Sequence, residues 1–310
     1  MLACSKRSPV LMRHKVSPSC SECYVPGCMS TTIAIVAKPR GEALRVAIEL
    51  RRWLRERGKT VLLDEGTAAE IPRARGARTA SLRKADLMIS VGGDGTLLHG
   101  AGLLAGAKVP IFGVNVGFLG FLTEITRDRL YPLLEQALEG EVTVEERMLL
   151  RIDLVRDGRR VLSGLVLNDA VVTKGALARM LELTCRIDER DVASYRADGL
   201  IVATPTGSTA YNLSAGGPII YPTLRGVIIA PICPHTLSQR PLLVPHTSVV
   251  SLKVSPRGEN LYLTLDGQRG RPLRPNDVVI AREARRSVHL VRDPEVHFFQ
   301  VLRQKLGWGG

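Results

Sequence analysis

Apolar and polar positions alternate in two different ways along the chain. In the first half, short apolar runs are separated by amphipathic or polar segments. Such runs predict buried strands, and a 3.6-residue apolar period predicts helices. The strands are expected at residues 33–37, 60–63, 87–91 and 108–114, and the helices at 42–57, 97–104 and 127–138. Residues 67–84 are poorly patterned and predict loop with short helix. Strands that alternate with helices indicate a parallel sheet covered on both faces.

After about residue 141 the helical pattern almost disappears, and one strand-like run follows another. Asp157-Gly158 between two of these runs predicts a hairpin turn. The runs lie at residues 149–156, 161–172, 179–187, 199–203, 227–232, 249–254, 260–265, 278–282 and 287–291. This succession is typical of an antiparallel sandwich. Residues 296–306 predict a final helix.

These patterns predict two domains. An α/β domain with a Rossmann-like parallel sheet is expected at residues 29–141, and a mainly antiparallel β-sandwich at 142–275. Residues 276–310 are expected to return to the first domain, with the C-terminal helix packing on it.

The composition of the chain indicates which classes of binding partner are expected. The 310 residues are 45% apolar, 24% charged and only 4% aromatic, with a net charge of +13. The basic residues are scattered and form no block with interleaved aromatics, so nucleic acid is not an expected partner. A field of this sign attracts phosphorylated small molecules. No apolar run approaches the ~18 residues of a membrane helix, and no membrane association is expected.

Residues 1–28 show no periodicity and hold four of the six cysteines, Cys4, Cys20, Cys23 and Cys28. They are read either as a metal or redox fragment or as a disordered or misassigned extension. The second reading is favoured, because nothing nearby completes a four-ligand site. A chain that starts at Met29 is therefore expected to fold and to be active. Cys185 and Cys233 lie in apolar runs and are interpreted as reduced core thiols, which favours a cytoplasmic location.

The clearest chemical signal of the first half is Gly92-Gly93-Asp94-Gly95-Thr96, which follows a predicted buried strand. The glycines allow a sharp turn and close approach to a ligand. The turn places a carboxylate at the carboxyl end of a strand, where open α/β sheets bind ligands. That carboxylate can take a proton from a hydroxyl. Alternatively, the segment is an ordinary strand-to-helix turn, with Asp94 as a cap. Thr96 is expected to cap the following helix.

The second half carries a denser polar motif, which begins at Arg196-Ala197-Asp198-Gly199. Between Thr204 and Tyr211, five of eight residues bear hydroxyl groups, interrupted by Pro205 and Gly207. Such a segment can present N–H and hydroxyl groups to a nucleotide without lysine. A Ser/Thr-rich loop with a helix cap is the alternative reading.

Together these motifs resemble the NAD kinases. The resemblance also includes Leu167-Asn168-Asp169 and Pro231 to Leu237, and it runs from about Ile33 to about Gln268. The first motif alone is shared with phosphofructokinases and lipid kinases, so the first domain is expected to be phosphofructokinase-like. The resemblance implies ATP-dependent phosphorylation of the adenosine 2′-hydroxyl of NAD to give NADP. It further implies a homodimer or homotetramer, and it leaves open whether polyphosphate replaces ATP.

By position, the resemblance assigns Asp94 as the general base, with Gly95 beside the ribose. The other NAD contacts that it implies are His99, Asn168, Asp169, Arg179, Arg196, Asp198, Thr209, Ala210, Tyr211, Asn212, Leu213, Ser214 and Gln268. The family more often has Glu at the position of Asp169, which has one methylene less. For His99, a solvent-exposed helix histidine is an equally supported reading.

The chemistry of the residues agrees with this reading. Phosphoryl transfer needs positioning and charge neutralisation, and Mg²⁺ bound to the ATP phosphates would supply charge without any metal site made by protein alone. Asp198 is expected to lie near Asn168 and Asp169, and its charge would favour cationic NAD over neutral NADH. A lipid kinase and a non-catalytic nucleotide-binding regulator are the alternatives. The hydroxyl-rich loop disfavours the first and Asp94 disfavours the second.

Overall fold

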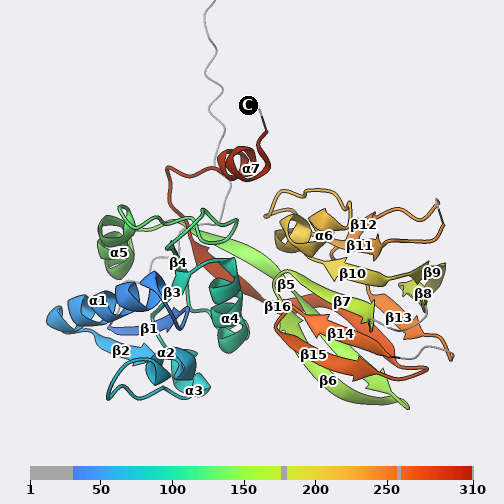
Figure 1. Cartoon of the computed structure of the whole chain (residues 1–310), viewed down its shortest axis with the longest axis horizontal. Helices are drawn as coiled ribbons and strands as arrows, with labels where there is room; N and C mark the ends of the chain where they lie inside the picture. The colour runs from blue at the N-terminus through green and yellow to red at the C-terminus, as the bar shows by residue number, and fades with distance from the viewer. Residues whose placement is uncertain (1–30, 176–179, 237, 257–259, 309–310) are drawn as a thin grey trace, which may run out of the picture.

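The computed structural model describes residues 31–175, 180–236, 238–256 and 260–308. These residues form two lobes joined by long strands (Figure 1). The predictions for residues 1–28, Met29, Arg179 and Leu237 fall outside the described residues. None of the helices in the described ranges combines the length and the apolar character of a membrane span.

The first lobe is built on a parallel sheet in the order β2-β1-β3-β4. Its strands are β1 (Thr32–Ala37), β2 (Thr60–Leu63), β3 (Leu87–Gly92) and β4 (Ile111–Asn115). Its helices are α1 (Glu42–Glu56), α2 (Glu65–Ala69), α3 (Thr79–Leu82), α4 (Asp94–Leu104) and α5 (Leu130–Glu139). The predicted α/β domain is confirmed.

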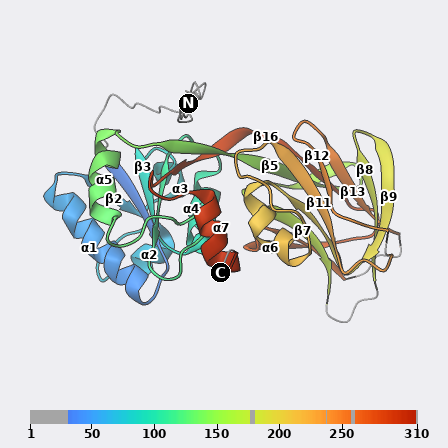
Figure 2. The ribbon, with the colours of Figure 1, turned by 90° about the horizontal axis from the view of Figure 1, so that it is seen from above.

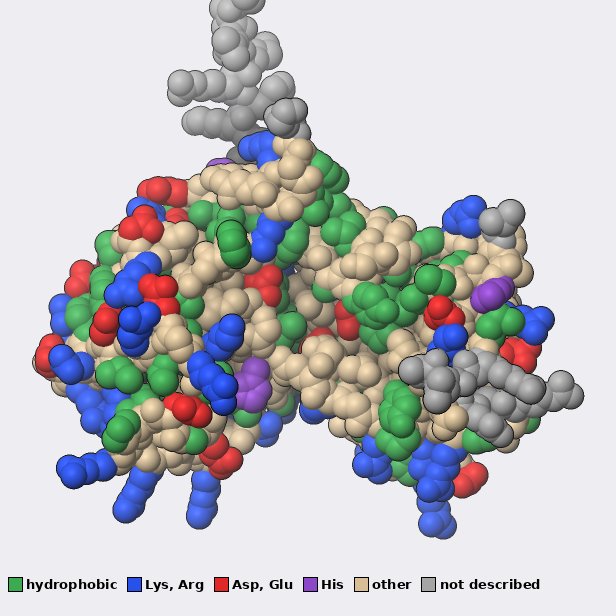
Figure 3. Space-filling model, in the orientation of Figure 1, with side chains coloured by type: hydrophobic (Ala, Val, Ile, Leu, Met, Phe, Trp, Pro, Cys, Tyr) green, Lys and Arg blue, Asp and Glu red, His purple; other side chains and the backbone are tan. Residues whose placement is uncertain are grey.

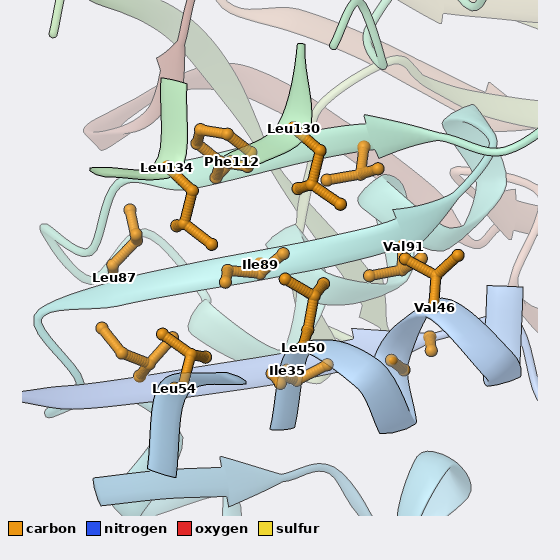
Figure 4. Packing of buried hydrophobic residues seen from close by; sticks show 14 of the residues in the cluster. Ile35, Val46, Leu50, Leu54, Leu87, Ile89, Val91, Phe112, Leu130 and Leu134 are labelled. Carbon is orange, nitrogen blue, oxygen red and sulfur yellow. The ribbon is translucent and has the colours of Figure 1, made fainter. Parts of the chain in front are cut away.

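Side-chain alternation along the strands separates two apolar layers in this lobe. On β1, Ile33 and Ile35 face the layer that contains α1 and α5, and Ala34 and Val36 face the layer of α4. Figure 4 shows the first layer, in which Ile35 and Ile89 pack against Leu50. Because both faces are buried, the strands are continuously apolar, as in other parallel sheets.

The second lobe is a sandwich of antiparallel strands. One sheet has the order β12-β11-β10-β7-β14-β15, and β5, β6, β8, β9, β13 and β16 form the other layer. The strands of the first half are β5 (Val144–Arg156), β6 (Arg159–Val166), β7 (Asp169–Lys174), β8 (Leu181–Ile187), β9 (Arg190–Ala197) and β10 (Gly199–Ala203). The later strands are β11 (Gly226–Ile232), β12 (Leu242–Pro245), β13 (Val250–Val254), β14 (Leu261–Leu265), β15 (Arg269–Leu273) and β16 (Val278–Val291). A core of aliphatic side chains fills the space between the layers.

The last strand and helix connect the two lobes. β16 pairs with β5 along its length and then pairs in parallel with β4 at Leu290 and Ile111. Helix α7 (Phe298–Leu306) lies above the junction (Figure 2). Its Phe298 ring is 5.3 Å from the Tyr221 ring of the second lobe, and its Lys305 lies over Phe121 of the first. The C-terminal segment therefore returns to the first domain, as predicted.

Several element boundaries differ from the prediction. The run expected at 161–172 is divided into β6 and β7, because the Asp266 carboxylate takes the N–H groups of Leu167 and Asn168. The two strands expected at 278–291 are one strand with a bulge between Glu283 and Ser287. The exposed strands β9, β12 and β15 were not predicted, since they bury little apolar surface.

Cys233 also differs from its prediction. Cys185 is buried, as expected of a core thiol, but Cys233 is exposed. The reason is that β11 ends at Ile232, so that Cys233 falls in the turn that follows.

Candidate functional site

Asp94 lies where the carboxyl end of β3 meets the first turn of α4. Helix α4 begins at Asp94 itself, with Gly93 in the N-cap position and no side-chain capping bond. The predicted capping role of Thr96 is therefore wrong, because Thr96 is already inside the helix. Its hydroxyl oxygen is close to Gly92, where an added Cβ would come within 2.4 Å of it.

The Asp94 carboxylate holds the loop that follows β4. Its Oδ1 accepts bonds of 3.0 Å from the N–H groups of Leu122 and Thr123 and from the Thr123 hydroxyl, and its Oδ2 accepts one from Phe121 N–H at 2.9 Å. Asp94 is thus not a helix cap, since its partners lie 27–29 residues away. The bonds fix the orientation of the carboxylate and leave Oδ2 with unused acceptor capacity.

Gly120 makes this arrangement sterically feasible. A Cβ at Gly120 would lie 2.0 Å from Asp94 Oδ1 and 2.3 Å from the Thr123 hydroxyl oxygen. A Cβ at Gly117, in the same loop, would meet no atom within 4 Å. The sequence showed this loop only as apolar and punctuated by glycine. The sequence does not indicate that this loop supports Asp94, because the backbone N–H groups that do so are present in every residue type except proline.

The second lobe contributes a turn built around another carboxylate. Asp266 accepts bonds of 2.8–3.1 Å from the N–H groups of Leu167, Asn168 and Asp169. Thr204 holds the same turn from the other side, with its N–H on the Asn168 carbonyl and its hydroxyl on the Leu167 carbonyl. Gly207 approaches so closely that an added Cβ would lie 2.2 Å from the Asn168 carbonyl oxygen. The motifs at 167–169 and 204–207 therefore form one unit.

Polar groups in this unit have unusual environments. The Asn168 Oδ1 atom is buried and has no hydrogen-bond partner among the described residues. Burial, together with the negative charge of Asp266, raises the pKa of Asp169 to about 7. Burial also raises the pKa of Asp266, against the three N–H bonds that it accepts. Unsatisfied acceptors and perturbed carboxyl groups of this kind cluster at ligand sites.

Gln268 connects this unit to the Asp94 turn. Its side-chain amide donates to the Gly95 carbonyl at 3.0 Å, from the turn that also contains Asp266. The two motifs, more than 70 residues apart in sequence, therefore meet at the junction of the lobes. Figure 3 shows that the surface is hollowed at this waist. The structure thus brings together Asp94, Gly95, Asn168, Asp169 and Gln268.

The hydroxyl-rich segment lies directly after β10. It forms the short helix η1 (Thr206–Thr209) and then α6 (Tyr211–Ser214). Asn212 is buried and donates to the carbonyls of Ser208 and Pro218, so its amide supports the turn from inside. The side chain of Tyr211 is exposed. The predicted contacts Thr209, Ala210, Leu213 and Ser214 accompany these two residues in the same segment.

Asp198 and Arg196 do not lie beside Asn168 and Asp169. β7 and β10 are antiparallel, with Ala203 opposite Asp169 and Gly199 opposite Thr173. Asp198 is therefore at the far end of β7, about 17 Å from Asp169 at the usual rise of a strand. There its carboxylate pairs with Lys174 at 3.1 Å. The expectation that Asp198 lies near Asn168 and Asp169 is wrong, because a short buried strand separates the two motifs.

His99 is exposed on α4 and faces the end of β2. Its Nε2 is 3.7 Å from a carboxylate oxygen of Asp64, which also caps α2 through Thr67 N–H. Among the described residues, no hydrogen bond or ion pair joins His99 to the second lobe.

A buried ionic group near the waist was not predicted. Arg292 pairs with Glu124 at 2.7 Å and with Glu145 at 3.0 Å, and Arg147 reaches the Thr206 hydroxyl at 3.4 Å. These side chains connect four parts of the chain. Glu124 lies in the loop after β4, Glu145 and Arg147 lie in β5, Arg292 follows β16, and Thr206 belongs to η1. Charged residues at strand ends are ordinary in sequence, so nothing in the sequence indicated that they would be buried together.

Family models match both lobes of the chain. The model described as ATP-NAD kinase N-terminal domain covers residues 33–142, and the model described as ATP-NAD kinase C-terminal domain covers residues 167–293. Relatives named NAD kinase include those of Solibacter usitatus, 47% identical over 90% of this chain and 98% of theirs, and Trichlorobacter lovleyi, 46% identical over 89% and 98%.

Solved structures agree in fold. A yeast NADH kinase in complex with NADH has a TM-score of 0.84 and 26% identity, over 91% of this chain and 89% of that chain. An NAD kinase of Archaeoglobus fulgidus in complex with ATP has a TM-score of 0.72 and 26% identity, over 90% and 100%. The arrangement of two lobes is therefore shared with both structures.

Proposed function

The chain belongs to the NAD kinase family, and from this premise we propose that Asp94 is the general base of its reaction. That reaction is the ATP-dependent phosphorylation of the adenosine 2′-hydroxyl of NAD, which gives NADP. The relatives favour neither the lipid kinase nor the non-catalytic regulator.

The two carboxylate oxygens of Asp94 accept different numbers of hydrogen bonds, and this difference supports its role as the base. Oδ1 accepts three hydrogen bonds and Oδ2 accepts one, so Oδ2 can take a further bond from a ribose hydroxyl. The loop holds the carboxylate in place before substrate arrives. A positioned carboxylate of this kind orients the hydroxyl and removes its proton as the phosphoryl group is transferred.

The other predicted contacts can be arranged along one NAD molecule. Asn168 Oδ1 lacks a partner and would accept a hydrogen bond from a hydroxyl of the adenosine half. Asp169 follows it in the chain, and Gln268 lies beside Gly95. The segment Thr209–Ser214 would surround the nucleotide. Arg196 and Asp198, at the other end of β7, would meet the nicotinamide half, since a dinucleotide has two ends to be recognised.

The donor chemistry follows from the residues present. In the described ranges, no three His, Cys, Asp or Glu side chains converge as a protein metal cage requires. We therefore expect Mg²⁺ to be held mainly by the ATP phosphates and water, which is how Mg²⁺ commonly binds. The ion would neutralise phosphate charge. We further infer a homodimer or homotetramer in the cytoplasm, on the strength of the family resemblance.

The test compares the parent with Asp94→Asn in the presence of NAD, ATP and Mg²⁺, with NADP formation as the readout. Turnover of Asp94→Asn should fall by on the order of 10² or more, while NAD binding stays within several-fold. Asp86→Asn is the matched control, because Asp86 lies at the opposite end of β3, where its carboxylate accepts bonds from Thr31 and Thr32. Turnover of Asp94→Asn within threefold of the parent would remove Asp94 from the role of base.

A further inference from the structure

A cavity lies between the lobes, next to the turn that holds Asn168. It has a volume of about 950 Å³, within the range of small-molecule sites. One wall comes from α3 and α4 of the first lobe and the other from β5, β6 and β16 of the second. The cavity shares Leu167 and Asp266 with the support of Asn168. None of the predicted NAD contacts lines it.

The cavity is lined by arginine to an unusual degree. The six arginines are Arg83, Arg151, Arg269, Arg282, Arg285 and Arg286. We call this cavity the arginine cleft. Acidic side chains in the lining are Asp266 and Glu283 only. No aromatic side chain lines the cleft, so it offers no stacking platform for a base.

Most of this positive charge has no carboxylate partner. Arg151 and Arg282 both form ion pairs with Asp153, and Glu283 pairs with Arg225 and His246. Asp266 accepts bonds from backbone N–H groups and is influenced by the charge of Arg269, although the two form no ion pair. In the described part of the chain, no ion pair involves Arg83, Arg269, Arg285 or Arg286.

Three of these four arginines donate to backbone carbonyls. Arg83 donates to Leu103, Arg269 to Leu165 and Arg286 to Ala105. Each guanidinium group carries five N–H donors, so these single bonds leave most donors free. Free guanidinium forks facing one cavity match the oxygens of phosphate, which they bind in pairs.

We propose that the arginine cleft binds an oligophosphate anion, held by Arg269, Arg285 and Arg286 and separate from the NAD contacts. An oligophosphate offers several negative groups in a chain, which suits charges spread over the two strands β15 and β16. Two sources share this chemistry: the triphosphate of the phosphoryl donor, in which case the proposal rests on the proposed function, and a free oligophosphate that acts as an effector.

The direct test uses inorganic tripolyphosphate as the probe and isothermal calorimetry on the full chain. Arg285→Gln combined with Arg286→Gln should weaken binding at least tenfold, since charge-assisted bonds to phosphate are lost. Arg159→Gln combined with Arg160→Gln is the charge-matched control, because both residues are exposed at the start of β6 and outside the cleft. The control should stay within twofold of the parent.

Arg286 also packs near Gly106, so the double variant can lose stability. The single variant Arg285→Gln keeps that packing and should still weaken binding severalfold, with an unchanged melting temperature. Equal losses in the cleft and control variants would overturn the proposal, as would a parent that does not bind tripolyphosphate.

Kinetics then identify the source. A tenfold higher KM for ATP in the cleft variant, with an unchanged KM for NAD, identifies the donor triphosphate as the occupant. An unchanged KM for ATP together with lost tripolyphosphate binding identifies a separate effector. Asp94→Asn should bind tripolyphosphate like the parent. If the proposed function is wrong, the parent will bind tripolyphosphate but form no NADP. If the arginine cleft is not the binding site, the parent will form NADP but will not bind tripolyphosphate there.

Discussion

The two ends of β7 differ in almost every physical respect. At the Asp169 end, the Asp169 carboxyl group is buried, N–H groups converge on Asp266, and Gly207 leaves no room for a Cβ beside the Asn168 carbonyl. At the other end, Asp198 is 42% exposed and Lys174 offsets its charge. Both ends were predicted NAD contacts, yet only the first is tied to Asp94, through Gln268 and Gly95.

The difference separates two ways of recognising a ligand. A buried, hydrogen-bonded frame keeps polar atoms at fixed positions, which is what chemistry on one hydroxyl requires. An exposed ion pair adjusts at little cost and contributes little, because water screens it. We therefore expect substitutions at the Asp169 end and in the Asp94 loop to have large effects, and substitutions at the Asp198 end to have small ones.

The largest effect is expected from Gly120→Ala. The new Cβ would lie 2.0 Å from Asp94 Oδ1, so either the loop or the carboxylate must move. Displacement of a catalytic group by about 1 Å costs on the order of 10² in rate. Gly117→Ala, in the same loop, meets open space and should change kcat less than twofold. Similar kcat values for the two variants would show that the position of Asp94 does not limit turnover.

An intermediate effect is expected on the pH dependence of stability. Burial and Asp266 raise the pKa of Asp169 to about 7, above its value in the unfolded chain. Between pH 4 and 7 the folded chain keeps a proton that the unfolded chain releases, so the free energy of unfolding falls as pH rises. In the parent, this effect should lower the free energy of unfolding by on the order of 1–3 kcal/mol between pH 5 and 8, and Asp169→Asn should abolish that decrease.

Urea unfolding at pH 5 and pH 8 measures this difference. Burial raises the pKa of Asp266 as well, and its contribution has the same sign but is present in both proteins. The comparison of parent and variant therefore reports Asp169 together with its charge coupling to Asp266. Asp198→Asn, at the exposed end, should behave like the parent. A parallel pH dependence in Asp169→Asn and the parent would contradict the buried state assigned to Asp169.

The comparison also explains what the sequence could predict. The apolar periods located β1 to β4 and most sandwich strands, because buried faces leave a pattern. A polar turn at a strand end indicated Asp94, since such turns are visible in one dimension, whereas Asn168 and Gln268 were assigned by the resemblance to NAD kinases. The separation of Asp198 from Asp169 was missed, because it depends on the direction in which β10 runs beside β7.

Other features of the site leave no local signal at all. The loop that holds Asp94 acts through backbone N–H groups of Phe121, Leu122 and Thr123. The arginine cleft assembles side chains from residues 83 to 286, which lie far apart in sequence. In sequence these arginines are indistinguishable from a solvated basic surface. Only the tertiary structure reveals that they face one cavity while their acidic neighbours are occupied elsewhere.

The smallest effect concerns the choice between NAD and NADH. An anionic Asp198 near the nicotinamide half would favour the cationic oxidised ring, but Lys174 at 3.1 Å offsets that charge. We therefore expect the parent to prefer NAD over NADH only a few-fold in kcat/KM. Asp198→Asn should reduce this preference and Lys174→Gln should enlarge it, because the first leaves the positive charge uncompensated and the second leaves the negative charge uncompensated. Opposite shifts in the two variants would place the pair beside the nicotinamide ring. Identical ratios in the parent and both variants would mean that this end of β7 does not sense the charge of the ring, and recognition would then rest on the Asp169 end alone.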